Sequence, residues 1–251
     1  MVEQVQGLHR GLAVIQSTPM MEEEQHVPET AFGKWFLRTP TWTHHVLERA
    51  LLDLDPLIPV RRESYAVVAD VGCGYGRSLP RLHARFKPAR LIGMDIDPEM
   101  IEAGRAECAA AGVPVEMIRC SASHIALPDA SVDLLFCHQT FHHLVEQEEA
   151  LAEFHRVLKP GGVLLFAEST RRYIHSWIIR LLFRHPMDVQ RTAPEYLALV
   201  QAAGFAVAPQ SVSYPYLWWS REDLGIAERW FRIKPPADRE ETLINLAAVK
   251  A

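Results

Sequence analysis

Three glycines at alternate positions follow an apolar segment near residue 70. The segment 67–71 is followed directly by Gly72, Gly74 and Gly76, and a helix pattern begins at Arg77. Glycine has no Cβ, so a loop of this kind can turn tightly and let the backbone approach a ligand. The loop predicts a nucleotide-binding turn between a strand and a helix, although an ordinary strand-to-helix turn can show the same spacing.

Two carboxylates accompany this loop. Asp95 ends the next apolar segment, 19 residues after Gly76, where a carboxylate can accept the hydroxyls of a bound ribose. Asp70 comes just before the loop, where it can order the loop amides or meet a cationic group of the ligand. Arg77 occupies the position at which the dinucleotide pattern G-x-G-x-x-G requires glycine. The sequence therefore favours a nucleoside without phosphates, S-adenosylmethionine (SAM), over NAD as the weaker alternative.

Short apolar segments alternate with helix patterns from Tyr65 onward. Strands are predicted at 65–71, 90–95, 115–119, 132–137, 163–168, 205–212 and 242–249, and helices at 77–86, 98–111, 148–158 and 194–203. Buried strands that alternate with helices are typical of a parallel sheet covered on both faces. The predicted fold class is α/β, with a single doubly wound, Rossmann-like sheet.

The remaining segments of the chain are expected to precede this domain or to be inserted in it. Residues 1–30 are polar and aperiodic and are expected to be flexible, and residues 31–64 are expected to form an N-terminal helical cap. The domain itself is predicted to cover 65–251. Insertions at about 171–190 and 214–240 follow predicted strands, and we expect them on the side where the cofactor binds.

Several motifs occur in the order found in class I SAM-dependent methyltransferases. They are Asp70–Gly76, Asp95–Asp97, Cys120–Asp133, Thr140–Leu144 and Arg156–Gly162. The chain resembles the small-molecule branch that includes the ubiquinone and menaquinone C-methyltransferases, closely over 65–170 and loosely over 190–212. The resemblance implies a seven-stranded sheet whose last strand is antiparallel, SAM as cofactor and S-adenosylhomocysteine as product.

The same resemblance implies which residues contact the cofactor. They are Asp70, Gly72, Cys73, Gly74, Gly76, Asp95, Ile96, Ser121, Ala122 and His138. This family usually has Asp-Ala after the third strand, with the Asp receiving the adenine amino group. Here the pair is Ser121-Ala122, and a neutral hydroxyl is a weaker acceptor than a carboxylate.

His142 and His143 follow the fourth predicted strand and are the candidate catalytic residues. An imidazole has an unperturbed pKa of about 6.5, so either ring could deprotonate a hydroxyl acceptor. Alternatively, both rings cap the following helix or pack against it. We expect alignment of the two substrates to supply most of the catalysis, without a histidine base.

Aromatic side chains are concentrated in three segments that can cover the site. The lid candidates are Trp35, Phe36, Tyr173, Trp177 and Trp218. Aromatic walls suit a flat or apolar acceptor. Residues 171–184 could form a core helix or a helix on a membrane surface instead of a lid, and the aromatic side chains could instead form a homodimer interface.

Composition limits the partners. The chain of 251 residues has a net charge of −5 and no long run of Lys or Arg, which disfavours a nucleic acid. No signal peptide pattern and no apolar run of about 20 residues is present, so we expect a cytoplasmic protein. The four cysteines show no paired spacing, so we expect free thiols and no metal. Cys120 and Cys137 could hold a soft metalloid, as in arsenite methyltransferases, but the cysteine pairs of that family are missing.

The sequence thus predicts a methyltransferase that transfers the methyl group of SAM to an O, C or N nucleophile. The acceptor is expected to be a small, partly apolar or aromatic molecule. One alternative is a SAM-binding regulatory or scaffold protein without turnover, and a weaker one is an NAD-dependent oxidoreductase.

Overall fold

The structure is a computed structural model that describes Val27, residues 29–221, 224–234 and 239–251. Most of the segment 1–30, which the sequence predicts to be flexible, lies outside the described residues. Among the described helices, none is long and apolar enough to cross a membrane.

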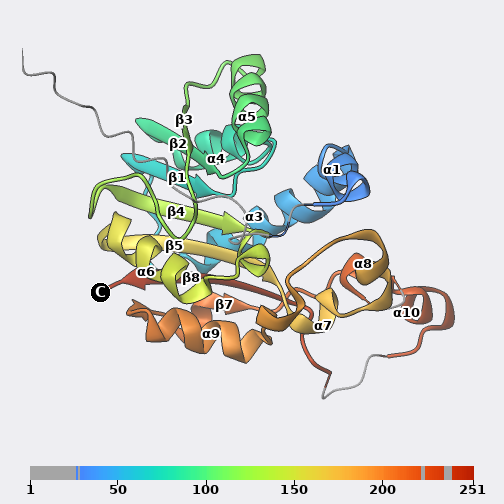
Figure 1. Cartoon of the computed structure of the whole chain (residues 1–251). Coiled ribbons are helices and arrows are strands. Elements are labelled where there is room, and N and C mark those ends of the chain that lie inside the picture. The colour runs from blue at the N-terminus through green and yellow to red at the C-terminus, as the bar shows by residue number, and fades with distance from the viewer. Residues whose placement is uncertain (1–26, 28, 222–223, 235–238) are drawn as a thin grey trace, which may run out of the picture.

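A mixed β-sheet forms the centre of the molecule (Figure 1). Its strands are β1 (Val67–Val71), β2 (Arg90–Asp95), β3 (Glu116–Arg119), β4 (Val132–His138), β5 (Leu158–Ser169), β6 (Phe205–Ala206), β7 (Val212–Ser213) and β8 (Leu243–Lys250). The order is β3-β2-β1-β4-β5-β8-β6, and β7 also pairs with β8. The first five strands run parallel, and β8 is antiparallel to β5. This confirms the predicted α/β fold with an antiparallel last strand.

The sheet has eight strands where seven were expected, because the segment 205–212 is not one continuous strand. Strands β6 and β7 pair separately with β8, and the 3₁₀ turn η5 (Pro209–Ser211) separates them. Proline has no N–H to donate to a β-ladder, so pairing is interrupted there.

Helices cover both faces of the sheet (Figure 1). The α-helices are α1 (Ala31–Leu37), α2 (Pro40–Trp42), α3 (Glu48–Leu54), α4 (Leu79–Phe86), α5 (Pro98–Ala110), α6 (Gln147–Val157), α7 (Arg171–Ile174), α8 (Trp177–Leu182), α9 (Ala193–Ala202) and α10 (Ile226–Phe231). The shorter helical turns are η1 (Thr43–Leu47, π-helical), η2 (Asp55–Leu57), η3 (Phe141–His143), η4 (Met187–Val189) and η6 (Trp218–Ser220).

Two apolar cores lie on opposite faces of the sheet. Val68 of β1 packs in a core with Leu51 of α3 and with residues of α4 and α5. Its neighbour Ala69 packs in the other core, with Phe154 of α6 and Tyr196 of α9. Successive strand residues point to opposite faces, and both faces are covered, which explains why these strands are apolar throughout.

Polar residues fix where the helices begin. Helix α5 starts after Asp97, whose side chain accepts the backbone N–H of Glu99 at 2.8 Å. Helix α9 starts with a capping box, in which Thr192 and Glu195 bind each other's backbone amides. Such caps satisfy N–H groups that have no partner inside the helix.

Two inserted segments lie at one end of the sheet. Helices α7 and α8 follow β5, and η6 and α10 lie between β7 and β8. In Figure 1, these helices and α1 gather on the right, at the end of the sheet toward which the arrowhead of β4 points. The carboxyl ends of parallel strands are where ligands bind in α/β sheets.

Candidate active site

The glycine loop after β1 uses its glycines for two different purposes. Gly74 has φ +52°, and a Cβ added there would meet nothing within 4 Å, because the backbone borders an open cavity. Gly76 has φ +74°, and a Cβ there would lie 2.5 Å from the Cα of Gly104 in α5. Gly74 therefore exposes the backbone to a ligand, whereas Gly76 allows the loop to pack against α5.

Asp95 at the end of β2 holds this loop in place. Its Oδ2 accepts the backbone N–H of Gly74 at 2.9 Å, and its Oδ1 accepts the N–H of Asp97 at 3.0 Å. The residue also lines the cavity. A carboxylate at this position can accept a hydroxyl of a ligand in the cavity.

A cavity of about 190 Å³ opens beside the loop and beside the ends of β2 and β3. Six of the ten predicted cofactor residues line it: Gly72, Gly74, Asp95, Ile96, Ser121 and Ala122. Apolar side chains of Met100 and Leu144 add to its walls. The Ser121 hydroxyl lies 2.9 Å from the hydroxyl of Ser123, so it is already in a local hydrogen bond.

The other four predicted cofactor residues lie elsewhere. Gly76 packs against α5, as described above. Asp70, Cys73 and His138 line a smaller cavity of about 70 Å³, which shares Gly72 and Gly74 with the first. Burial lowers the pKa of His138 to about 3, so its ring is neutral, and it packs on Phe136 with ring centroids 5.6 Å apart. The structure thus places a neutral His138 ring in this smaller cavity, packed on Phe136.

Asp70 is buried under the glycine loop. Its side chain accepts a hydrogen bond from the hydroxyl of Ser78, rather than bonds from the loop amides. Burial raises the pKa of Asp70 to about 8, and the nearby charge of Asp95 acts in the same direction, while the Ser78 hydrogen bond opposes the rise. A carboxyl in such a position is ready to ionise when a cation approaches.

The four cysteines are free thiols. Cys120 lines the 190 Å³ cavity that contains six of the predicted cofactor residues, from here on called the cofactor cavity, and the other three are buried. Burial raises the pKa of the Cys73 and Cys137 thiols well above the ordinary value, which makes them poor nucleophiles.

A second, more apolar cavity of about 280 Å³ adjoins the first. Three parts of the chain that are distant in sequence contribute to its walls: the N-terminal helices, residues 169–185, and Trp218, Trp219 and Leu224. Hydrogen bonds join these segments. The Thr30 hydroxyl donates to the carbonyl of Leu182 at 2.7 Å, and the indole N–H of Trp219 donates to the carbonyl of His45 at 2.9 Å.

The structure separates the five lid candidates into two groups. Phe36, Tyr173 and Trp218 line the apolar cavity. Trp35 and Trp177 do not, and they are 59% and 68% exposed. In residues 171–184, the buried side chains of Ile174 and Ile179 also line the cavity, so this segment contributes to its wall.

His142 forms a buried pair with a residue that the motifs do not include. Its Nδ1 lies 2.6 Å from Oε2 of Glu168, and the Glu168 side chain has no exposure to solvent. The other oxygen of Glu168 accepts the backbone N–H groups of Thr140 and Phe141 at 3.0 and 2.8 Å. Glu168 therefore fixes both the loop after β4 and the orientation of the His142 ring.

The two cavities meet at four shared residues: Glu29, Leu37, Gln139 and His143. Gln139 lies in the left-handed region, with φ +52°, and its side-chain oxygen accepts the hydroxyl of Ser169 at 2.6 Å. A molecule in the apolar cavity and one in the cofactor cavity would face each other across these side chains.

Sequence reasoning missed several residues of this site. The sequence could have indicated Glu168, because an acidic residue at the end of an apolar strand is buried and needs polar partners. Gln139 and His185 had no such signal in the sequence. His185 lies in the link between α8 and η4, and only the folded chain brings it beside His142.

Comparisons with known proteins agree with this geometry. Residues 69–166 match the family model described as a methyltransferase domain. A methyltransferase-like protein of Schizosaccharomyces pombe is 36% identical over 136 residues, which are 53% of this chain and 49% of that protein. The demethylmenaquinone methyltransferase of Deinococcus radiodurans is 30% identical over 149 residues, which are 58% of this chain and 59% of that protein.

A solved structure shares the fold. That of geranyl diphosphate methyltransferase in complex with SAM has a TM-score of 0.60 and 19% identity, and covers 85% of this chain and 92% of its own. The chain spans about half the length of the curated relatives that it matches. Residues 69–166 therefore match a methyltransferase domain, and the fold is shared with solved SAM-dependent methyltransferases.

Proposed function

We propose that this protein transfers the methyl group of SAM to an O, C or N nucleophile of a small, largely apolar molecule. The observation that carries the proposal is the junction between the cofactor cavity and the apolar cavity at Leu37, Gln139 and His143. A methyl transfer needs the donor carbon and the acceptor atom in contact and in line, and two adjoining cavities provide such an arrangement.

The residues of the first cavity fit SAM. The open space at Gly74 admits a ligand against the backbone, and Asp95 lines the cavity, where a carboxylate can accept ribose hydroxyls. Ile96, Ala122 and Leu144 offer apolar contacts to a flat base. When bound, SAM supplies a methyl group on a positively charged sulfur, which is already activated for transfer.

Asp70 is suited to the charged end of the cofactor. It lines the small cavity that shares Gly72 and Gly74 with the cofactor cavity. An approaching ammonium group lowers the pKa of a buried carboxyl, so cofactor binding would release a proton from Asp70 near neutral pH. This role deepens the expectation that Asp70 meets a cationic ligand group.

The acceptor is proposed to be apolar because of the side chains around its cavity. Phe36, Trp218 and Ile178 line the cavity beside other aromatic and aliphatic residues. Burial of such surface favours binding by about 25 cal/mol per Å² of apolar area. Two of the similar proteins are named for demethylmenaquinone and geranyl diphosphate, which supports an acceptor with an apolar part.

Alignment is proposed as the main source of catalysis. Gln139 is fixed through Ser169, and His142 is fixed through Glu168, so the junction is held in place by hydrogen bonds. Well-oriented reactants can gain about 7–11 kcal/mol over a bimolecular encounter.

The two rival functions have less support. For the NAD-dependent oxidoreductase, the dinucleotide pattern requires glycine at position 77. This chain has Arg77 there, which forms an ion pair with Glu107 of α5 at 3.1 Å. A regulatory SAM-binding protein would have no need for a second apolar cavity at the cofactor.

The test is a transfer assay with SAM that carries an isotopic label on its methyl group, mixed with fractions of a metabolite extract. We expect label in an organic-soluble product and an equal amount of S-adenosylhomocysteine. The Gly74→Val variant is the matched control and should give neither. Binding of SAM without any labelled product from the extract would support the regulatory function, and reduction of NAD would support the oxidoreductase.

A further inference from the structure

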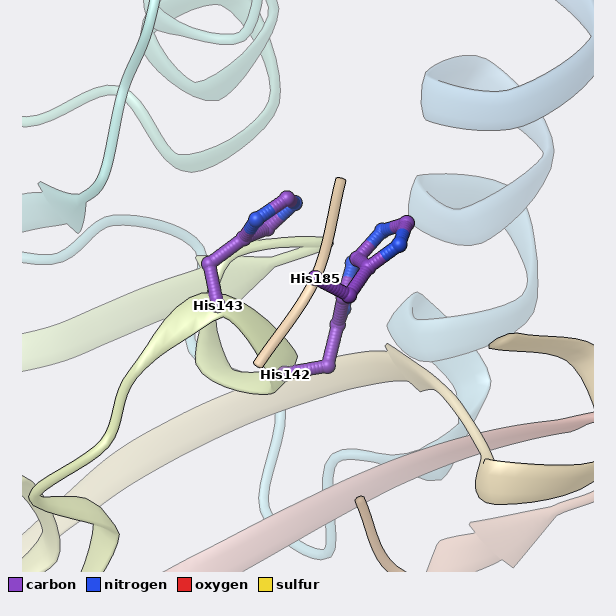
Figure 2. A group of neighbouring side chains, drawn as sticks. All are labelled: His142, His143 and His185. Atoms are coloured by element: carbon purple, nitrogen blue, oxygen red, sulfur yellow. The ribbon is translucent and has the colours of Figure 1, made fainter. Parts of the chain in front are cut away.

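Three histidines from two separate segments form a cluster at the junction of the cavities. His142 and His143 lie in η3, and His185 lies between α8 and η4. One nitrogen from each ring lies within 4.8 Å of the other two, and the ring centroids are 4.4, 4.7 and 5.1 Å apart. Figure 2 shows the three imidazoles gathered side by side, with His185 reaching the pair from a different stretch of chain.

The environment of His142 is that of a metal ligand. A carboxylate accepts hydrogen bonds, so its 2.6 Å contact with Glu168 places the proton on Nδ1 and leaves the lone pair on Nε2. Metal-binding histidines almost always donate their second ring N–H to a carboxylate, a carbonyl or water in this way. The two backbone amides on Glu168 keep that carboxylate in position.

The other two rings complete the cluster. His185 is partly buried, and within the described part of the chain neither of its ring nitrogens has a hydrogen-bond partner; its contacts are with the rings of His142, His143 and Phe183. His143 has Nε2 3.2 Å from Oε1 of Glu29. Glu29 and Glu168 thus each place a carboxylate oxygen within 3.2 Å of a ring nitrogen of the cluster.

We propose that His142, His143 and His185 bind a divalent transition-metal ion such as Zn²⁺, with a fourth coordination position open to the apolar cavity. Imidazole nitrogens suit zinc, and sites with three protein ligands typically keep the fourth position for water or substrate. Zinc bonds of about 2.0–2.1 Å in tetrahedral geometry put ligand nitrogens about 3.3 Å apart. The rings therefore need to move together by about 1.5 Å or less.

If the proposed transfer function holds, the ion narrows the class of acceptor. All three histidines line the apolar cavity, and His143 also lines the cofactor cavity, so the ion would lie beside the position of transfer. A metal ion favours the ionised form of a bound oxygen group. The acceptor would then be an apolar molecule with an ionisable oxygen, such as a phenol or an enol.

Zinc binding can be tested without SAM or an acceptor, so its outcome is independent of the transfer assay. The full chain is freed of metal with a chelator and titrated with ZnCl₂ in a calorimeter. Co²⁺, whose visible absorption reports tetrahedral coordination, gives a second readout. We expect one Zn²⁺ for each chain, and no comparable binding of Mg²⁺, which prefers oxygen ligands.

Variants decide which residues hold the ion. His185→Ala should weaken zinc binding at least 100-fold, and Glu168→Gln should weaken it about 10–100-fold by releasing the His142 ring. His44→Ala is the matched control, because that histidine lies outside the cluster and its side chain is 59% exposed. Binding of S-adenosylhomocysteine by His185→Ala shows that the variant is folded. Absence of stoichiometric zinc in the unaltered protein, or unchanged zinc affinity in His185→Ala, would overturn the proposal.

Discussion

The buried carboxyl of Asp70 should make the stability of the fold depend on pH. Its pKa is raised from 3.8 in a free side chain to about 8 in the folded protein, mainly by burial. Between these two values the folded protein keeps the proton, whereas the unfolded chain has lost it. Stability is therefore present in full at low pH and declines as the pH rises toward the folded pKa.

The size of the effect follows from the width of this interval. Each pH unit inside it lowers the free energy of unfolding by about 1.4 kcal/mol, so the contribution of Asp70 should fall by about 3 kcal/mol between pH 5 and pH 7. Asp70→Asn removes the titration. Subtracting the free energy of unfolding of the variant from that of the unaltered protein therefore isolates this contribution, because the other groups cancel.

Urea denaturation of both proteins at pH 5, 6 and 7 measures this difference. Asp129→Asn serves as the matched control, because the Asp129 side chain is 78% exposed and incurs little desolvation. We expect the difference for Asp70 to change by about 3 kcal/mol and that for Asp129 to stay nearly constant. A difference for Asp70 that varies by less than about 1 kcal/mol over this range would refute the reasoning.

Three further predictions concern the two cavities. Asp95→Ala should weaken binding of S-adenosylhomocysteine by about 1.5–3 kcal/mol in calorimetry, because a charged acceptor is lost; unchanged affinity in a folded variant would contradict the ribose assignment. Trp218→Ala should lower kcat/KM for the acceptor about 10-fold or more at constant cofactor affinity, whereas the exposed Trp177→Ala should change neither. Gly74→Val should abolish cofactor binding with a modest loss of stability, about 1–2 kcal/mol. Gly76→Ala should mainly lower the unfolding temperature. If calorimetric scans show a larger drop in unfolding temperature for Gly74→Val than for Gly76→Ala, the roles given to the two glycines are wrong.

The fold was largely predictable because its signals are local. The strand at 90–95 and the helix at 98–111 match β2 and α5 to within a residue, since apolar runs, an N-cap and a proline define them. The strand predicted at 205–212 was wrong as one element, because Pro209 interrupts its pairing with β8. A proline inside an apolar run indicates a possible break in a strand. Whether the strand breaks depends on whether the proline faces a pairing neighbour, which the sequence does not show.

Six of the residues that the sequence assigns to the cofactor line one cavity for the same reason, and their contact with SAM stays a prediction. Gly72, Gly74 and Asp95 lie close to strand ends, and the parallel sheet brings strand ends together wherever the strands are identified. The resemblance assigned His138 to the cofactor, and the structure places this residue in the small cavity that also contains Gly72 and Gly74. The next two residues, Gln139 and Thr140, line both this small cavity and the cofactor cavity.

By itself, the sequence determined the α/β sheet, the glycine loop and the identity of the cofactor, because these follow from periodicity and from residues close together in the chain. Only the tertiary structure decided what surrounds the acceptor. The apolar cavity requires contacts between Phe32 and Phe183, and between His45 and Trp219, which are more than 150 residues apart. The histidine cluster similarly depends on the path of the chain after α8. Contacts of this kind arise from packing of whole elements, and no spacing in the sequence encodes them.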